Sequence, residues 1–173
     1  MKKVFILALV AAACITASLS ATTVAYVPLG RSIQMSDMVL VGHVLGLEAG
    51  YNQNGEIVTR VSLLVEESFK GAVRPGEVFT FDAWGGSLGD VNVVTVGEAH
   101  YQLGDKVFVQ LESIDGEYHT LGLSFGKWNV LRAKDGSQVL TRNLDDLNMV
   151  GITEVPVETI PLRQMRQIAR RPF

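Results

Sequence analysis

The sequence predicts a mainly β protein: a small barrel or sandwich of about seven strands, with a short helix at the C-terminus. Two observations lead to this fold class. Turn-forming residues recur at short intervals, and the runs between them have the length of strands. Helical periodicity is almost absent except near the two ends of the folded part. Many short strands joined by tight turns are typical of barrels and sandwiches.

The strands are expected between successive turn signals. Residues 38–45 are largely apolar, as in a strand covered on both faces, whereas residues 58–69 alternate between apolar and polar side chains. The second run is also long enough to bend around a small barrel. The remaining strands are expected at residues 78–83, 91–96, 106–113, 118–123 and 128–133.

Two short helices are expected, one at each end of the β region. Residues 28–35 can form a brief turn of helix before the first long strand. Residues 161–170 form the stronger candidate, because proline suits the first helical position and Leu162, Met165 and Ile168 fall on one face. We expect this face to pack on the β domain. An arginine stripe, formed by Arg163, Arg166 and Arg170, lies beside it.

The N-terminus has the layout of a secretory signal peptide, expected at residues 1–20. Two lysines precede an apolar run, and small residues follow it. The run is too short for a comfortable membrane-spanning helix, which needs about 20 residues. Cleavage after Ser20 or after Ala25 satisfies the small-x-small rule. The alternative is a lipoprotein anchored through Cys14, although the usual leucine three positions earlier is missing.

One domain is expected over residues 26–173, since about 150 residues bury enough surface to fold without disulfides or a structural metal. This region contains no cysteine, which excludes disulfides and thiolate metal sites from it. Without Lys2 and Lys3, the chain has 13 basic and 18 acidic residues, a formal charge of −5. Such an acidic chain is a poor nucleic-acid binder, because affinity for phosphate comes from neutralising cations.

The chemistry-bearing residues give weak signals for catalysis or metal binding. Residues 122–126 match the G-x-S-x-G pattern around Ser124, but a strand follows and no histidine occurs after His119. The three histidines, at positions 43, 100 and 119, lack the spacing of a metal site. His43 is expected to be a hydrogen-bonded wall residue of its strand. We therefore expect no catalytic residue, no metal site and no cofactor.

Two adjacent acidic pairs, Glu66-Glu67 and Asp145-Asp146, are also candidates for paired-carboxylate chemistry. Neighbouring residues of an extended strand point to opposite faces, so neither pair can direct both carboxylates at one site. We expect all four side chains to be solvated charges.

The most unusual segment spans residues 84–90, expected to be a loop with Trp84 at its start. Gly85, Gly86 and Gly89 permit positive φ angles or close approach of another surface, and Trp84 can anchor a contact. The alternative is a tight connection whose tryptophan packs into the end of the barrel. The segment is not a phosphate-binding loop, because the Lys-Ser/Thr pair and the following helix of such a loop are absent. These four residues are the candidate binding site.

Several segments resemble a group of exported bacterial β-domain proteins of uncharacterised function. The likeness covers residues 36–130, including Ser36-Asp37-x-Val39, Phe69-Lys70-Gly71 and Gly122-x-x-x-Gly126-Lys127-Trp128. Residues 36–71 are also similar to the opening strands of the netrin-module and tissue-inhibitor-of-metalloproteinases barrel. This second resemblance implies a small OB-like barrel, closed or partly open.

The resemblance does not extend to the mechanism of those inhibitors. They grip the protease zinc through a mature N-terminal cysteine. No such cysteine precedes the first strand here, unless lipidation consumes Cys14, which would block its amine. The helix of an OB barrel between the third and fourth strands is also not evident between Ala83 and Lys106. We expect an exported, periplasmic or secreted, non-enzymatic module that binds an envelope or extracellular protein, peptide or glycan. The alternatives are an accessory or inhibitor of a secreted protease, and a hydrolase.

Overall fold

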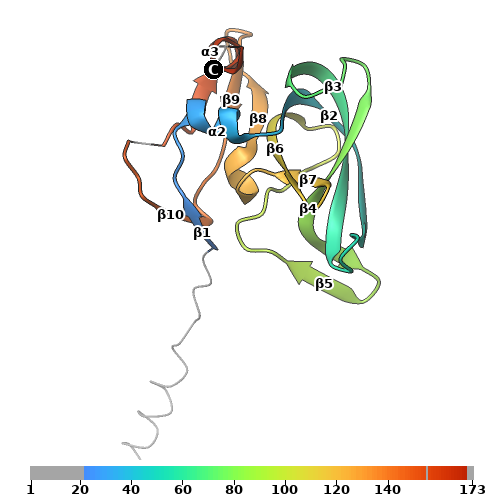
Figure 1. The fold of residues 1–173 in the computed structure, drawn as a ribbon. Coiled ribbons are helices and arrows are strands. Elements are labelled where there is room, and N and C mark those ends of the chain that lie inside the picture. Colours follow the sequence, from blue (N-terminus) through green and yellow to red (C-terminus); the bar gives the residue numbers. More distant parts are fainter. Residues whose placement is uncertain (1–21, 155, 171–173) are drawn as a thin grey trace, which may run out of the picture.

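The computed structural model describes residues 22–154 and 156–170, and the signal-peptide and Cys14 predictions lie outside them. The fold is mainly β with a short C-terminal helix, as the sequence predicts. The described residues form eleven strands rather than about seven (Figure 1). The strands are β1 (Thr22–Ala25), β2 (Met38–Tyr51), β3 (Ile57–Lys70), β4 (Val78–Leu88), β5 (Val91–Val94), β6 (Lys106–Ile114), β7 (Glu117–Thr120), β8 (Lys127–Arg132), β9 (Gln138–Thr141), β10 (Leu147–Val150) and β11 (Thr159–Pro161).

Five strands pair in a ring at the centre of the molecule. β2 pairs with β3 and β6, β3 pairs with β4, and β7 pairs with both β6 and β4. The last contact is parallel and consists of a single bridge, Asp82 with His119. Apolar side chains from these strands and from the 95–105 connection form the largest buried cluster, which includes Leu40, Leu63 and Phe81.

Helices cover one side of this sheet. α2 (Leu29–Met35) and α3 (Leu162–Ala169) lie next to each other in Figure 1 and pack over β2, β6, β8 and β9. Leu162 and Met165 of α3 are fully buried, and Ile168 packs beside them half-buried. The predicted docking of the C-terminal helix through this face is therefore confirmed, with Trp128 and Phe108 beneath it.

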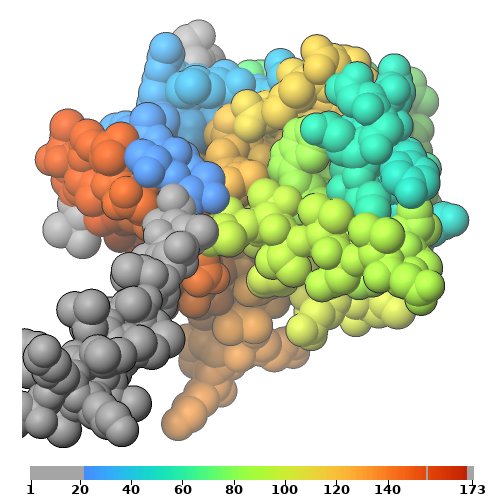
Figure 2. All heavy atoms as spheres, turned by 90° about the horizontal axis from the view of Figure 1, so that it is seen from below, coloured from blue at the N-terminus to red at the C-terminus, as the bar shows by residue number. Residues whose placement is uncertain are grey.

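The folded part begins before residue 26. β1 runs parallel to β10, with Thr22 opposite Leu147 and Ala25 opposite Val150. Val24 packs against a small cluster formed by Tyr26, Phe125, Leu144 and Leu147. The blue β1 and the red-orange segment that carries β10 lie side by side in Figure 2.

Most expected strands are present. Four short additional strands and two extensions of expected strands have little sequence signal. β1, β9, β10 and β11 have three or four residues each, too few for a visible alternation. β2 continues to Tyr51 and β4 to Leu88, six and five residues beyond the expected ends. The expected strand at 118–123 stops at Thr120, because Gly122 and Leu123 adopt positive φ angles and lead into a 3-10 turn, η1 (Leu123–Gly126).

The sheet has two very different ends. Its strand order is β11-β9-β8-β6-β2-β3-β4-β5. At one end β11 runs directly into α3 and is covered by it. At the other end β5 lies at the lower edge of the molecule in Figure 1.

No helix among the described residues is long and apolar enough to cross a bilayer.

Candidate binding surface at the β4–β5 hairpin

The candidate residues do not lie in a loop. Trp84, Gly85 and Gly86 belong to β4, and Gly89 lies in the two-residue turn that joins β4 to β5. The expected loop at 84–90 is therefore wrong. The two adjacent glycines allow the strand to twist sharply while it keeps its pairing with β5.

Gly85 and Gly86 are required by close approach as well as by their backbone angles. Both have positive φ angles, 87° and 146°. A Cβ atom on Gly85 would lie 2.5 Å from the carbonyl oxygen of Val93, and one on Gly86 would lie 2.6 Å from Thr59 Oγ1. Any side chain at either position would therefore displace β5 or Thr59.

A cavity of about 230 Å³ lies between the hairpin and the 95–101 segment. Residues from four strands line it, and Gly85 and Gly86 are in its wall, whereas Gly89 is not. Its remaining wall is mostly apolar or aromatic and includes Leu47, Val93 and Tyr101. A cavity of this size and character suits an apolar side chain rather than a large ligand.

Trp84 is not a free aromatic surface. Its ring stacks on the ring of His119, with centroids 4.0 Å apart and planes 2° from parallel. His119 is only 1% exposed, and its Nδ1 atom has no hydrogen-bond partner among the described residues. The alternative in which Trp84 packs against the end of the ring fits this arrangement better than a free contact anchor.

The edge strand β5 is exposed along its whole length. Val91 is 52%, Val93 40% and Val94 72% exposed. Figure 2 shows the yellow-green hairpin region open on this face, beside the turquoise end of the β2–β3 pair. Within the described residues, β5 pairs only with β4, so the backbone groups on its outer edge are free.

Glu98 is a functional candidate that sequence reasoning missed. Its side chain is 7% exposed and lies in the wall of the cavity. The Ala99 N–H donates to Oε1 at 2.9 Å, while Oε2 has no partner among the described residues. Burial raises the pKa of Glu98 to about 7, although the backbone N–H groups of Ala99 and Trp84 act against this rise.

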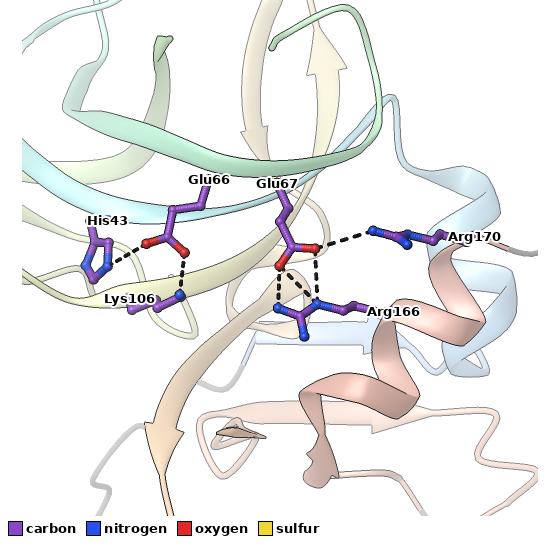
Figure 3. A network of polar contacts seen from close by, with 6 residues as sticks. All are labelled: His43, Glu66, Glu67, Lys106, Arg166 and Arg170. Carbon is purple, nitrogen blue, oxygen red and sulfur yellow. Dashed lines mark hydrogen bonds and ion pairs between the residues drawn. The ribbon is translucent and has the colours of Figure 1, made fainter. Parts of the chain in front are cut away.

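The acidic pair on β3 is divided between two polar clusters (Figure 3). Glu66 contacts Lys106 and lies 3.0 Å from Nε2 of His43, and the Lys106 contact lowers the pKa of Glu66. Glu67 points to the other side and accepts two hydrogen bonds from Arg166 Nε, at 3.0 and 3.1 Å. The prediction that the two carboxylates cannot share a site is confirmed, but neither is merely a solvated charge.

Arg170 completes the second cluster, at 3.6 Å from Glu67. Two arginines of the predicted stripe thus fix α3 to β3. Arg163 remains exposed at the open side of the helix.

Ser124 lies in η1, which is followed by β8 rather than by the α-helix of a nucleophile elbow. Its Oγ atom is buried and has no hydrogen-bond partner among residues 22–154 and 156–170. Ser124 and His100 both line a second cavity, separate from the one beneath the hairpin, but no hydrogen bond joins the two side chains. In the described part of the chain, no three histidine, aspartate or glutamate side chains gather into a group that could hold a metal ion.

The valines of β5 and the carboxyl of Glu98 gave little sequence signal. The 91–96 run was predicted as a strand, but a four-residue edge strand and a central strand have similar composition. Glu98 follows Gly97 in a segment without periodicity, and only the fold places it beneath the hairpin.

Comparison of the chain with protein-family models, curated proteins and solved structures finds no match.

Proposed function

We propose that this protein is an exported, non-enzymatic binding module on an OB-type barrel, and that it captures an extended segment of a partner protein along β5. The strand order supports the barrel type. The ring order is β2-β3-β4-β7-β6. Counted in chain order, the third strand of the ring (β4) and the fifth (β7) are parallel neighbours, and the fourth (β6) pairs with the first (β2). A five-stranded Greek-key barrel of the OB type has this arrangement.

The free edge of β5 carries the functional proposal. Natural edge strands are usually protected by lysine, proline or a covering element. The four residues of β5, Val91-Asn92-Val93-Val94, include neither a charge nor a proline, and three of them are exposed valines. An added strand would satisfy the free backbone groups and cover these valines.

The adjacent cavity supports a polypeptide partner rather than a glycan. Val93 and Val94 lie in its wall, so a strand beside β5 would place alternate side chains at its mouth. Sugars are commonly held against exposed aromatic faces. Here Trp84 is stacked on His119, and Trp128, the other tryptophan, is fully buried.

Site-specific cross-linking tests this proposal. A photoreactive residue is placed at Val94 and, as a matched control, at Leu103, an apolar side chain that is 67% exposed outside the hairpin. The protein is irradiated in the cells that produce it, and cross-linked peptides are identified by mass spectrometry. We expect Val94, but not Leu103, to cross-link to one extended segment of another protein.

Binding of a synthetic peptide with the identified sequence then measures the contribution of the edge. Val93→Lys and Val94→Lys should each weaken the peptide's affinity by roughly ten-fold or more, because a charge on β5 opposes strand addition. Leu103→Lys should change it less than about two-fold. Equal cross-linking from both sites, or unchanged affinity in the β5 variants, would contradict the proposal.

A further inference from the structure

A second cavity, of about 170 Å³, lies on the other side of the 98–100 segment. Its wall includes two basic side chains, Arg142 and Lys127, together with the amides of Asn129 and Asn143. Neither basic side chain forms an ion pair with a carboxylate in the described part of the chain. This is unexpected in a chain whose acidic residues outnumber its basic ones.

Arg142 is held rigidly in this wall. It is only 7% exposed, and its guanidinium lies 4.4 Å from the ring centre of Phe125 and 4.1 Å from that of Trp128. Nη1 donates to the carbonyl of Phe125 at 2.6 Å and Nε donates to that of Val157 at 2.9 Å. These contacts use two of its five N–H donors, and the rings stabilise its charge without neutralising it.

Lys127 is held in a similar way. Its ammonium group donates to the carbonyl of His100 at 2.7 Å and lies 5.3 Å from the ring centre of Tyr101. Two donors remain for a ligand. Burial lowers the pKa of Lys127 and lowers that of Arg142 to about 10, so burial makes both charges costly. Cations that are held in a partly buried wall without an ion-pair partner are candidates for ligand binding.

Ser124 adds a neutral donor. Its Oγ lies buried in the same wall and has no hydrogen-bond partner within the described residues. The 3-10 turn of the G-x-S-x-G segment thus presents its hydroxyl to the cavity. Two cations, two amides and one hydroxyl in a cavity of this volume are complementary to a small oxyanion.

We propose that this cavity binds a carboxylate group, held by Arg142 and Lys127 with Ser124 as a further donor. This site is separate from the edge of β5 and does not depend on the proposed function. Two acidic side chains in the wall, Glu98 and Asp146, select against a doubly charged anion such as phosphate, because they would repel its second charge.

The charge of the wall changes with pH. Glu98, whose pKa is raised to about 7 by burial, is mostly neutral below that pH and adds a negative charge above it. The exposed Asp146 and His100 also line the cavity, Glu158 and Tyr26 act on Arg142, and Asp105 acts on Lys127. Carboxylate affinity should therefore weaken as the pH rises through about 7.

Sodium acetate, titrated into the purified protein at constant ionic strength with chloride as the replaced anion, tests the site. The readouts are the melting temperature and the NMR shift of the Arg142 side-chain N–H. We expect saturable binding that Asn129→Asp abolishes, because this nearly isosteric change places a negative charge in the wall. Lys127→Met should weaken binding about ten-fold or more, and Ser124→Ala about two- to three-fold.

The matched control is Arg163→Ala, which removes an exposed cation from a different cleft. It should leave acetate affinity unchanged. Asn129→Asp and Lys127→Met keep both hydrogen bonds of Arg142, and the far-ultraviolet circular dichroism of each variant checks that it is folded. Absence of saturable binding, or equal binding by parent and folded Asn129→Asp protein, overturns the proposal.

Three further probes identify the source of the carboxylate. Acetyl-dialanine with a free C-terminus is compared with its amide and with propionate. Tighter binding of the free acid than of propionate supports a polypeptide C-terminus as ligand, and equal binding supports a small organic acid. Binding of the amide as tight as that of the acid overturns recognition of a carboxylate.

A pH series tests the role of Glu98. The acetate affinities of the parent and Glu98→Gln proteins are compared between pH 6 and 8, and only the parent should lose affinity as the pH rises.

Discussion

The two edge strands of the main sheet differ in whether another part of the chain covers them. At one end, β11 has three residues, finishes at Pro161 and continues directly into α3, whose apolar face is buried. At the other end, β5 exposes three valines and has no covering element among the described residues. The covered end is protected as edge strands usually are, whereas the uncovered end has none of the usual protection. This difference is the basis of the proposal that the β5 end binds a partner protein.

The acidic side chains beneath α3 and beneath the hairpin also have different partners. Glu67 beneath α3 is paired with Arg166 and Arg170. Glu98 beneath the hairpin contacts only backbone N–H groups, and no cation of the described chain pairs with it. Glu67 holds α3 against β3, whereas burial raises the pKa of Glu98 to about 7.

The largest expected effect is at the covered end. Deletion of residues 161–173 should lower the melting temperature by on the order of 10 °C or more, since burial of the α3 face contributes roughly 4 to 8 kcal/mol. Met165→Ala should remove about 2 to 5 kcal/mol of this, because the Met165 side chain is fully buried. Thermal unfolding followed by circular dichroism measures both. An unchanged melting temperature would show that α3 does not stabilise this edge.

Glu98→Gln should produce the next largest effect, and only at high pH. The folded pKa of Glu98, about 7, is above the unfolded value near 4.5, so the parent loses stability as the pH rises between these values. The variant does not ionise and should gain up to about 3 kcal/mol relative to the parent between pH 5 and pH 8. Urea unfolding at the two pH values measures this gain. Glu67→Gln is the control, and it should be destabilised at both pH values because it loses the charge that pairs with Arg166.

Gly86→Ala should destabilise the hairpin by about 1 to 3 kcal/mol. The new Cβ would lie 2.6 Å from Thr59 Oγ1, which also donates to the carbonyl of Gly85. Gly89→Ala, in the turn of the same hairpin, is the matched control because a Cβ there meets no atom within 4 Å. Urea unfolding of both variants separates the close contact from the cost of a positive φ angle. Equal losses would show that the contact with Thr59 is not limiting.

The smallest effect on stability is expected at the free edge. Val94→Lys should change the free energy of unfolding by less than about 0.5 kcal/mol, because the side chain is 72% exposed. Ile160→Lys, the equivalent change in the covered edge strand, should cost several kcal/mol because Ile160 is 4% exposed. Chemical unfolding of the pair measures the contrast. Similar losses in the two variants would contradict the proposed difference between the edges.

Much of the fold could be predicted from local sequence. Turn residues and apolar alternation placed the main strands, and the period of Leu162 and Met165 identified α3 and its buried face. These features depend on neighbours within a few positions, so their signals survive in a linear sequence. The short strands β1, β9, β10 and β11 gave no such signal, because each has only three or four residues. In addition, β1 and β10 pair with each other from opposite ends of the folded part.

The candidate sites depended more strongly on tertiary structure. The sequence singled out Trp84, Gly85 and Gly86, but only the fold placed them in a hairpin and stacked Trp84 on His119, 35 positions away in the chain. Likewise, Arg166 lies 99 positions from Glu67. The period of two could predict that Glu66 and Glu67 face apart, whereas their partners could not be predicted.

The sequence by itself determined the mainly β class, the C-terminal helix and the absence of cysteine chemistry from the folded part, because composition and local periodicity decide these properties. Tertiary structure alone decided which edge of the sheet is covered, where Glu98 is buried, and that Arg142 and Lys127 share one cavity. The physical reason is that burial and electrostatic environment arise from contacts between distant segments. A charged side chain carries no local mark of the partners that it will have, or lack, after folding.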